Sequence, residues 1–173
     1  VYSDGFIDAL GAAALAAGRS DRPVHVKVDT GMQRVGAQPE VVAALVQRIG
    51  EHSPMLRLGG VFTHLAVADE PGDEFTALQL GRFDEVLTTL GLGEDVAVHA
   101  ANSAGALAHP AARRSFVRAG IAVYGISPGH GVDDLCHDLR PALSLRARVS
   151  FVKTVRAGSR ISYGLRHTFD RNT

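Results

Sequence analysis

The 173-residue sequence has no tryptophan and a single cysteine, Cys136. One cysteine excludes an internal disulfide and is typical of a protein from a reducing compartment, so we expect a cytoplasmic location. We interpret Cys136 as structural, because no neighbouring motif supports a nucleophile. Basic and acidic residues balance at 18 each. Net charge therefore gives no support for a nucleic-acid partner or an anionic membrane surface.

Several other signals are missing. No apolar run approaches the roughly 18 residues that span a bilayer, and no secretory signal pattern opens the chain. No acidic cluster or Cys/His spacing predicts a metal site. The phosphate-binding motifs GxxxxGK[ST] and GxGxxG are absent as well. The chain starts with Val1, and its last four residues are polar; we expect it to be a piece of a longer protein.

The apolar spacing predicts an alternation of helices and strands. Helices are expected over residues 5–17, 39–50, 73–90 and 103–109, and strands over 24–29, 96–101 and 116–125 and within 56–66, around 61–64. Such alternation is typical of an α/β protein with a parallel sheet, either closed as a barrel or open and doubly wound. The period-two pattern of residues 143–155 predicts an antiparallel β segment. The domain boundary is expected within residues 126–140.

Polar residues follow the predicted strands, where α/β proteins gather their functional groups. They include Lys27, which interrupts an apolar alternation where an ammonium is costly unless it is paired or chemically changed. With backbone N–H groups near a glycine, the cations suit an anionic, phosphorylated ligand. The residues at these ends are Lys27 to Arg34, His64, Asn102, Ser103 and Arg118 to Ile121.

Several of these residues, and Tyr163 further along the chain, also have a purely structural interpretation. Lys27 could lie at a strand end with its head in solvent. His64 could be a hydrogen-bonded core histidine, and Ser103 an N-cap of the following helix. Arg118 could be a surface cation at a strand edge, and Tyr163 an ordinary half-buried aromatic. Spacing alone leaves these alternatives open.

Six stretches resemble alanine racemase, a pyridoxal 5′-phosphate (PLP) enzyme, in the order that the family has them. They are HVKVDTGMQRVG, GVFTHLAVAD, HAANSAGAL, VRAGIAVYG, LRPALSLRARV and ISYG. The resemblance implies a partial PLP-binding (β/α)₈ TIM-like barrel over residues 1–128. Residues 129–173 would supply a linker and the first strands of a mostly β C-terminal domain. It further implies a cytoplasmic bacterial enzyme that makes D-alanine for peptidoglycan.

The resemblance also assigns roles to individual residues. Lys27 matches the family lysine that is carbamylated, and Arg34 the arginine near the substrate carboxylate. His64 matches the histidine beside the pyridine ring, and Arg118 the arginine at the pyridine nitrogen. His99 resembles a histidine that supports the catalytic tyrosine. Cofactor binding is further implied for Asn102, Ser103, Gly120 and Ile121.

Tyr163 matches the base that acts on L-alanine across the interface of a homodimer. The resemblance thus gives catalytic roles to Tyr163, Arg34, His64 and Arg118, with alanine as substrate. The lysine that holds PLP belongs to a motif resembling VKANAYGHG, which these 173 residues do not contain, so we expect the chain alone to be inactive. The loop after Tyr163 also departs from the family form. A broad-specificity amino-acid racemase and a non-catalytic PLP-binding barrel remain as alternatives.

Overall fold

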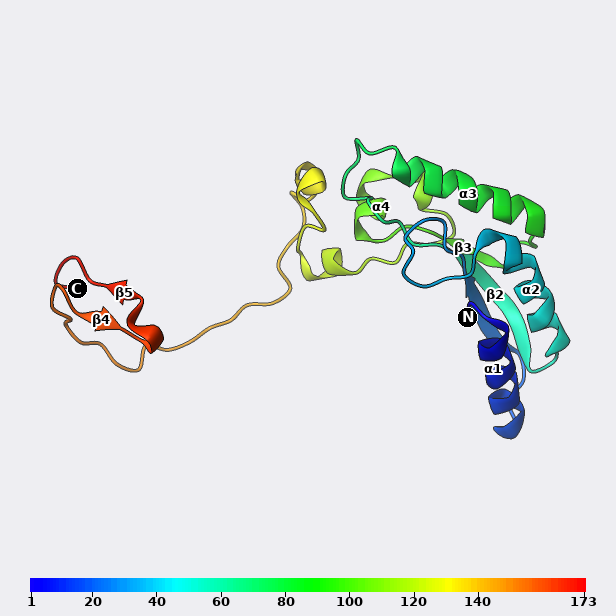
Figure 1. Cartoon of the computed structure of the whole chain (residues 1–173), viewed down its shortest axis with the longest axis horizontal. Coiled ribbons are helices and arrows are strands. Elements are labelled where there is room, and N and C mark those ends of the chain that lie inside the picture. Colours follow the sequence, from blue (N-terminus) through cyan, green and yellow to red (C-terminus); the bar gives the residue numbers. More distant parts are fainter. The chain divides into compact units, whose positions relative to one another are not determined.

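The computed structural model describes residues 1–173 and divides the chain into two compact units, Val1–Ala142 and Leu143–Thr173 (Figure 1). The first unit contains a three-stranded parallel sheet with helices between its strands. The α/β prediction is therefore confirmed. The sequence-based division between residues 128 and 129 stays a prediction. No helix combines the length and the apolar character needed to cross a membrane.

The sheet has the strand order β1-β2-β3. Its strands are β1 (Arg22–Lys27), β2 (Leu56–Phe62) and β3 (Ala97–His99), and both pairs run parallel. The strands follow one another in space as they do in sequence, with helices in the connections. All three carboxyl ends consequently lie at the same edge, which is where the predicted functional residues gather.

Four α-helices belong to the first unit: α1 (Asp4–Ala16), α2 (Val42–Glu51), α3 (Phe75–Leu90) and α4 (Ser103–Ala108). They confirm the four predicted helices to within a few residues. A 3₁₀ turn, η1 (Pro39–Val41), leads into α2. Three more such turns follow α4, namely η2 (Pro110–Ala112), η3 (Ile121–Tyr124) and η4 (His130–Leu135). Helix α2 packs on β1 and β2 and contacts both α1 and α3.

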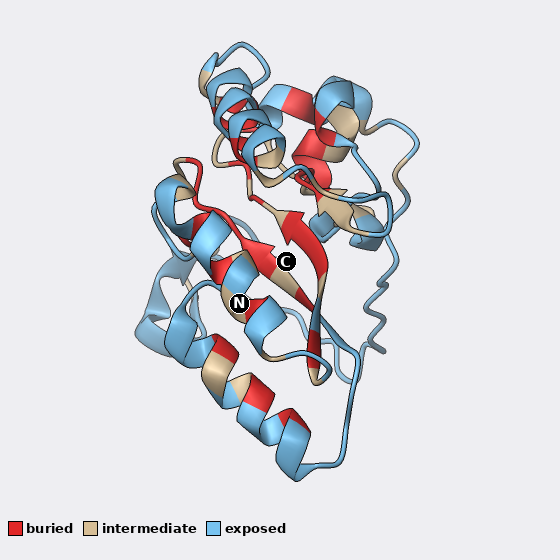
Figure 2. Cartoon of the chain, turned by 90° about the vertical axis from the view of Figure 1, so that its right-hand side faces the viewer, coloured by how far each residue is buried: buried red, intermediate tan, exposed pale blue.

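The core lies between the sheet and the inner faces of these helices (Figure 2). Helix α2 buries Val42, Leu45 and Ile49, at the spacing that places side chains on one helical face. They pack against strand residues such as Val26 and Val61, both fully buried. Burying one such side chain contributes about 1.5–3 kcal/mol relative to leaving it exposed. This packing fixes the sheet, and with it the edge that carries the polar residues.

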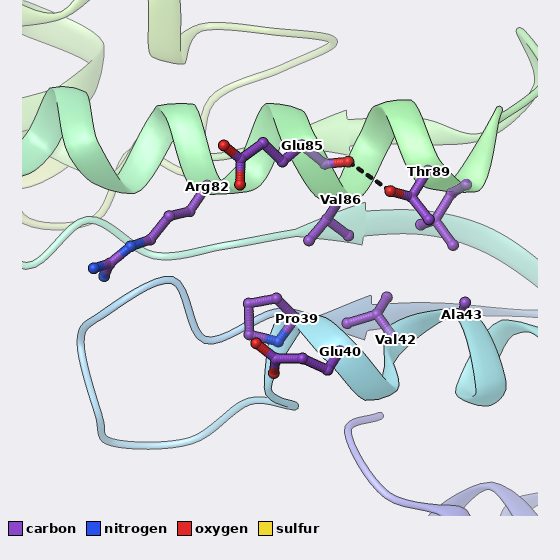
Figure 3. A pocket seen from close by; sticks show the side chains of 9 residues that line it. Pro39, Glu40, Val42, Ala43, Arg82, Glu85, Val86 and Thr89 are labelled. Carbon is purple, nitrogen blue, oxygen red and sulfur yellow. Dashed lines mark hydrogen bonds between the residues drawn. The ribbon is translucent and has the colours of Figure 1, made fainter.

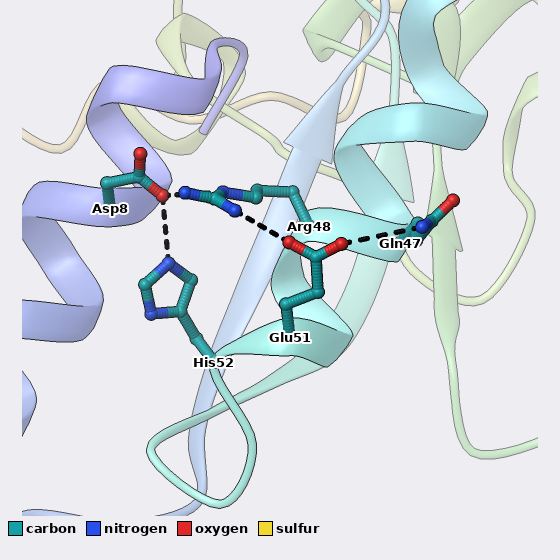
Figure 4. Close-up of polar contacts among 5 residues, drawn as sticks. All are labelled: Asp8, Gln47, Arg48, Glu51 and His52. Atoms are coloured by element: carbon teal, nitrogen blue, oxygen red, sulfur yellow. Dashed lines mark hydrogen bonds and ion pairs between the residues drawn. The ribbon is translucent and has the colours of Figure 1, made fainter.

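A polar cluster on the outside joins α1 to α2 (Figure 4). Asp8 accepts hydrogen bonds from Arg48 at 2.7 Å and His52 at 2.8 Å. Arg48 also pairs with Glu51 at 2.6 Å. The hydrogen bond from Arg48, followed by that from His52, lowers the pKa of Asp8 to about 2. The cluster is exposed, so salt screens it, and the apolar contacts dominate the docking of α1.

Two predicted strands are wrong. Residues 116–125 contain no strand. Gly120 leaves the extended region at φ −102° and ψ −99°, and η3 follows it. Residues 143–155 have the alternating pattern of a strand but form none: Val155 alone exchanges backbone hydrogen bonds, with Thr173, and Leu145 is 96% exposed. A strand is stable only when its backbone groups are paired, which the pattern alone does not guarantee.

The second unit contains a short antiparallel hairpin. Strand β4 (Arg160–Ile161) pairs with β5 (His167–Thr168), and a 3₁₀ turn, η5 (Tyr163–Leu165), connects them. Arg160 Nε donates to the carbonyl oxygen of Leu165 at 2.7 Å, across the turn. Tyr163 lies on this turn and is fully exposed. The half-buried aromatic predicted as its structural alternative is therefore wrong.

Candidate active site

The loop after β1 carries the first group of candidate residues. Asp29 Oδ1 accepts from the backbone N–H groups of Gly31 at 2.9 Å and Gln33 at 3.1 Å, which closes a turn just before Arg34. Gly36 has a φ of 136° and lies so close to Asp29 that a Cβ would come 2.8 Å from its backbone nitrogen. The loop therefore folds tightly back to the strand and presents Arg34, which is exposed.

Lys27 is the last residue of β1 and is buried, at 8% exposure. It forms no ion pair with an acidic side chain. Burial lowers the pKa of its ammonium, and the positive charge of Arg34 adds to the effect, against an opposing contribution from Asp29. Lys27 thus lies at the strand end, but the predicted alternative that its head lies in solvent is wrong. The buried environment of Lys27 favours the neutral amine more than exposure to solvent would.

Arg118 reaches the ends of β2 and β3. Its Nη2 donates to the carbonyl oxygens of Thr63 at 2.7 Å and Ala100 at 3.0 Å. Its guanidinium carbon lies 5.2 Å from the centre of the Phe62 ring. Burial lowers the pKa of this guanidinium, yet arginine stays protonated in proteins. Arg118 is therefore a fixed, half-buried cation, and the surface-cation alternative is wrong.

The hydrogen bonds of Arg118 define the protonation of His99. Its Nη1 lies 2.7 Å from His99 Nδ1, and because arginine can only donate, this Nδ1 must accept and carries no proton. Arg118 Nη2 lies 3.3 Å from His64 Nδ1, but its two N–H groups already donate to the carbonyl oxygens of Thr63 and Ala100. Burial and then the charge of Arg118 lower the pKa of His64, and the same two causes lower that of His99 to about 4. Both rings are consequently neutral at pH 7.

His99 in turn contacts His25, so that a series of hydrogen bonds leads from Arg118 through His99 to His25. His99 Nε2 and His25 Nδ1 are 2.8 Å apart. Since His99 Nδ1 accepts from Arg118, its Nε2 carries the proton and donates it to His25. Gly60 of β2 leaves room for the His25 ring, because a Cβ there would approach His25 Nδ1 to 2.6 Å. The arrangement is a directional chain from Arg118 through His99 to His25.

The expected support of the catalytic tyrosine by His99 stays a prediction. Within the first unit, both ring nitrogens of His99 have partners, His25 and Arg118. The ring also stacks on Phe62 and Phe116, with centroids 4.7 and 4.3 Å away. His99 therefore holds Arg118 in position. The role of His25 was not predicted from the sequence, because there His25 is only one residue of a β-strand pattern.

Ser103 lies at the start of α4, beside the loop that leads into η3. Its Oγ accepts from the backbone N–H groups of Gly120 at 2.8 Å and Ala122 at 3.3 Å. The N-cap predicted as its structural alternative belongs to Asn102, whose Oδ1 accepts from Gly105 N at 2.9 Å. Asn102 Nδ2 also donates to the Leu65 carbonyl at 3.2 Å. Asn102 thus fixes Ser103 rather than offering its own side chain.

The resulting site is rich in donors and cations. The hydroxyl of Ser103 meets the backbone N–H groups of Gly120 and Ala122. In Arg118, Nε and the second N–H of Nη1 form no hydrogen bond. Lys27 and Arg34 add positive charge. This donor set fits a phosphorylated, anionic ligand. The structure thereby brings Lys27, His64, Asn102, Ser103, Arg118, Gly120 and Ile121 to one edge of the sheet, with Arg34 on the adjoining loop. Tyr163 belongs to the second unit.

A groove of the first unit lies away from this edge. This open groove of about 440 Å³ lies between α3 and the η1–α2 segment (Figure 3). Its lining includes Pro39, Val42 and Val86, with Glu40, Arg82 and Glu85 at its rim. None of the candidate residues contributes to it. A shallow groove between outer helices offers few converging polar groups, so the carboxyl edge of the sheet remains the better candidate.

Residues 1–128 match the family model described as "Alanine racemase, N-terminal domain". The alanine racemase of Symbiobacterium thermophilum is 47% identical over 150 residues, which cover 86% of this chain and 39% of that protein. The solved structure of the Streptomyces coelicolor alanine racemase has a TM-score of 0.90 and 36% identity, covering all of this chain and 46% of that one. A histidine racemase structure from Leuconostoc mesenteroides matches with a TM-score of 0.86, 26% identity and coverages of 99% and 46%. The chain thus spans less than half the length of these proteins.

The neutral state of His99 can be tested by imidazole ¹⁵N NMR of the full-length protein. We expect a proton on Nε2 only, and protonation near pH 4 instead of the ordinary value of about 6.5. Because the folded pKa is lowered, the neutral ring contributes stability above about pH 6.5 that is lost as the pH falls towards 4. A proton on Nδ1 at pH 7, or titration near 6.5, would contradict the directional chain.

Proposed function

The chain belongs to the alanine racemase family, and we propose that its full-length protein interconverts L-alanine and D-alanine with PLP as cofactor. The observation that carries the proposal is Arg118. It is a half-buried cation, held by neutral acceptors alone, and its Nε and one N–H of Nη1 carry no hydrogen bond. The family's N-terminal domain is a (β/α) barrel. We assign residues 129–173 to the linker and first strands of its mostly β C-terminal domain.

The residues of the carboxyl edge fit PLP. Ser103 and the backbone N–H groups of Gly120 and Ile121 would hold the phosphate, with Asn102 positioning Ser103. Arg118 would donate a hydrogen bond to the pyridine nitrogen, and His64 would lie beside the ring. PLP would supply the conjugated system that delocalises the charge left when the α-proton departs. The guanidinium keeps its proton and leaves the ring nitrogen unprotonated, which weakens electron withdrawal and limits side reactions.

Arg34 would bind the substrate carboxylate, and Lys27 would orient Arg34 once carbamylated. A neutral Lys27 amine attacks the carbon of CO₂, forming an N–C bond and releasing one proton. The resulting anion pairs with Arg34. The lowered pKa of Lys27 supports this step, because only the unprotonated amine reacts. A ¹³C resonance from labelled CO₂ that disappears in Lys27→Ala would identify the adduct, and an unmodified Lys27 in the active protein would contradict it.

Tyr163 would remove the α-proton of L-alanine, acting on the active site of the partner in a homodimer. Its full exposure on a hairpin turn supports contact with another chain. A phenol with a pKa of about 10 is a poor base at neutral pH. The cations of the opposing site would favour its ionised form. A lysine outside these 173 residues would hold PLP and serve the opposite face of the substrate.

The biological role that we propose is the supply of D-alanine for peptidoglycan in the cytoplasm of a bacterium. A single cysteine and the reducing compartment it indicates are consistent with that location. A broader amino-acid racemase is the second candidate, supported by the similarity to a histidine racemase. A non-catalytic PLP-binding barrel is less well supported, because it would not need the exposed Tyr163.

The decisive assay measures conversion of L-alanine to D-alanine by the full-length protein with PLP. We expect racemisation in both directions, and faster with alanine than with histidine. Similar rates for both amino acids would favour the broad-specificity enzyme. Bound PLP without conversion of any amino acid would contradict the racemase and support the non-catalytic barrel.

Replacing Tyr163 with Phe removes the proposed base but keeps the ring. We expect racemisation to fall by about 10²- to 10⁴-fold, the usual contribution of a general base. In D₂O, deuterium should still enter D-alanine at Cα, because the lysine serves that face, whereas exchange from L-alanine should be lost. Tyr124→Phe, which changes another exposed tyrosine, is the matched control. Equal loss of exchange from both enantiomers would refute the assigned face.

A further inference from the structure

Gln79 is a polar residue at a position where the helix pattern calls for an apolar one. It lies on the inner face of α3, in line with the buried residues Thr76, Leu80 and Phe83, and is itself 0% exposed. A buried carboxamide is costly unless each of its polar atoms has a partner. Gln79 was not predicted as a functional residue, and its partners explain why it is there.

All the hydrogen-bonding groups of the Gln79 carboxamide are used. Its Oε1 accepts from Ala66 N at 2.8 Å. Its Nε2 donates to the carbonyl oxygen of His64 at 3.1 Å and to Thr30 Oγ1 at 3.2 Å. Because Oε1 must face an N–H and Nε2 must face a carbonyl, the amide has only one orientation that satisfies all three partners.

The chain of protons continues through two buried hydroxyls. Thr63 Oγ1 donates to the Val28 carbonyl at 3.0 Å, which uses its only proton. Thr30 Oγ1, 2.7 Å from Thr63 Oγ1, must therefore donate to it, and this leaves Thr30 free to accept from Gln79. The order runs from Gln79 through Thr30 and Thr63 to Val28. Every buried polar atom in it is paired, which makes such a network rigid.

These contacts join the two loops that carry the candidate residues. Thr30 belongs to the loop after β1 and precedes Arg34 by four residues, whereas His64 belongs to the loop after β2. Helix α3 adds a second contact to the first loop, since Arg82 Nη1 donates to the Thr30 carbonyl at 3.0 Å. Gln79, which is fully buried, therefore ties the two loops together beside the direct hydrogen bond between Thr30 and Thr63.

We propose that Gln79 is a positioning residue that sets the placement of Arg34 relative to His64 by hydrogen-bonding both loops at once. The inference rests on the proposed racemase function for its catalytic consequence. Arg34 would receive the substrate carboxylate and His64 would lie beside the cofactor. A shift of one loop against the other therefore misaligns substrate and cofactor. Misplacement of about 1 Å can cost about 100-fold in rate.

The test uses the full-length protein with PLP and the variant Gln79→Met, which keeps the length of the side chain and removes all three hydrogen bonds. We expect kcat/KM for L-alanine to fall about 10- to 100-fold, with KM raised because Arg34 no longer meets the carboxylate. PLP content should fall less than kcat/KM, since the contacts of Ser103 with Gly120 and Ala122 do not involve Gln79. The matched control is Thr76→Val. Thr76 is buried on the same helix face, and its hydroxyl has no partner, so kcat and KM should stay as in the wild type.

A second pair of variants keeps the test decisive if Gln79→Met does not fold. Thr30→Val removes the hydroxyl that accepts from Gln79, and Thr30→Ser restores it. We expect Thr30→Val to lose kcat/KM and Thr30→Ser to recover most of it. Equal kcat/KM in both, or kinetics of Gln79→Met equal to those of Thr76→Val, would overturn the positioning role.

A crystal structure of Gln79→Met, or of Thr30→Val in its place, separates this inference from the proposed function. We expect residues 29–36 to be displaced from residues 63–66 relative to the wild type. Unchanged loops would overturn the inference even if the wild type racemises alanine. Displaced loops in the variant, together with a wild type that does not racemise alanine, would support the positioning of Arg34 and His64 and refute the proposed function alone.

Discussion

The guanidinium of Arg118 is a half-buried cation without an acidic partner, and the carboxyl edge of the sheet depends on how it is held. Its hydrogen bonds end on two carbonyl oxygens and on the unprotonated Nδ1 of His99, and Nδ1 of His64 lies 3.3 Å away. A carboxylate partner would neutralise the charge, whereas neutral acceptors preserve it and restrict its orientation. His99 must therefore stay neutral, and burial next to a cation ensures that both histidines do.

Two series of hydrogen-bonded side chains hold the residues of this edge in place. One runs from Arg118 through His99 on β3 to His25 on β1 and crosses β2, where Gly60 leaves the necessary space. The other runs from Gln79 through Thr30 to Thr63 and ties α3 to two loops. In both series the direction of each proton follows from a group that can only donate or has a single proton. Such series favour one arrangement over near alternatives, which suits a site that must fix a charged ligand.

The sequence predicted the parts of the fold that periodicity controls. Helix α2 and strand β1 carry clear apolar patterns, and both lie where expected. The strand predicted from periodicity over residues 143–155 is wrong, because an alternating pattern does not by itself supply a second strand to pair with. The strand predicted over residues 116–125 is wrong for another reason, because the backbone turns at Gly120 although the apolar pattern continues past it. Gln79 and His25 went unrecognised because their roles arise from partners far away in the sequence, which only the folded chain brings together.

The most direct measurement is a crystal structure of the full-length protein with PLP. The account predicts that the pyridine nitrogen accepts a hydrogen bond from Arg118 while His99 and His25 keep their contacts. It also predicts that the phosphate replaces Ser103 as the acceptor of the N–H of Gly120. PLP bound in the groove between α2 and α3, or an acidic group paired with Arg118, would contradict the account.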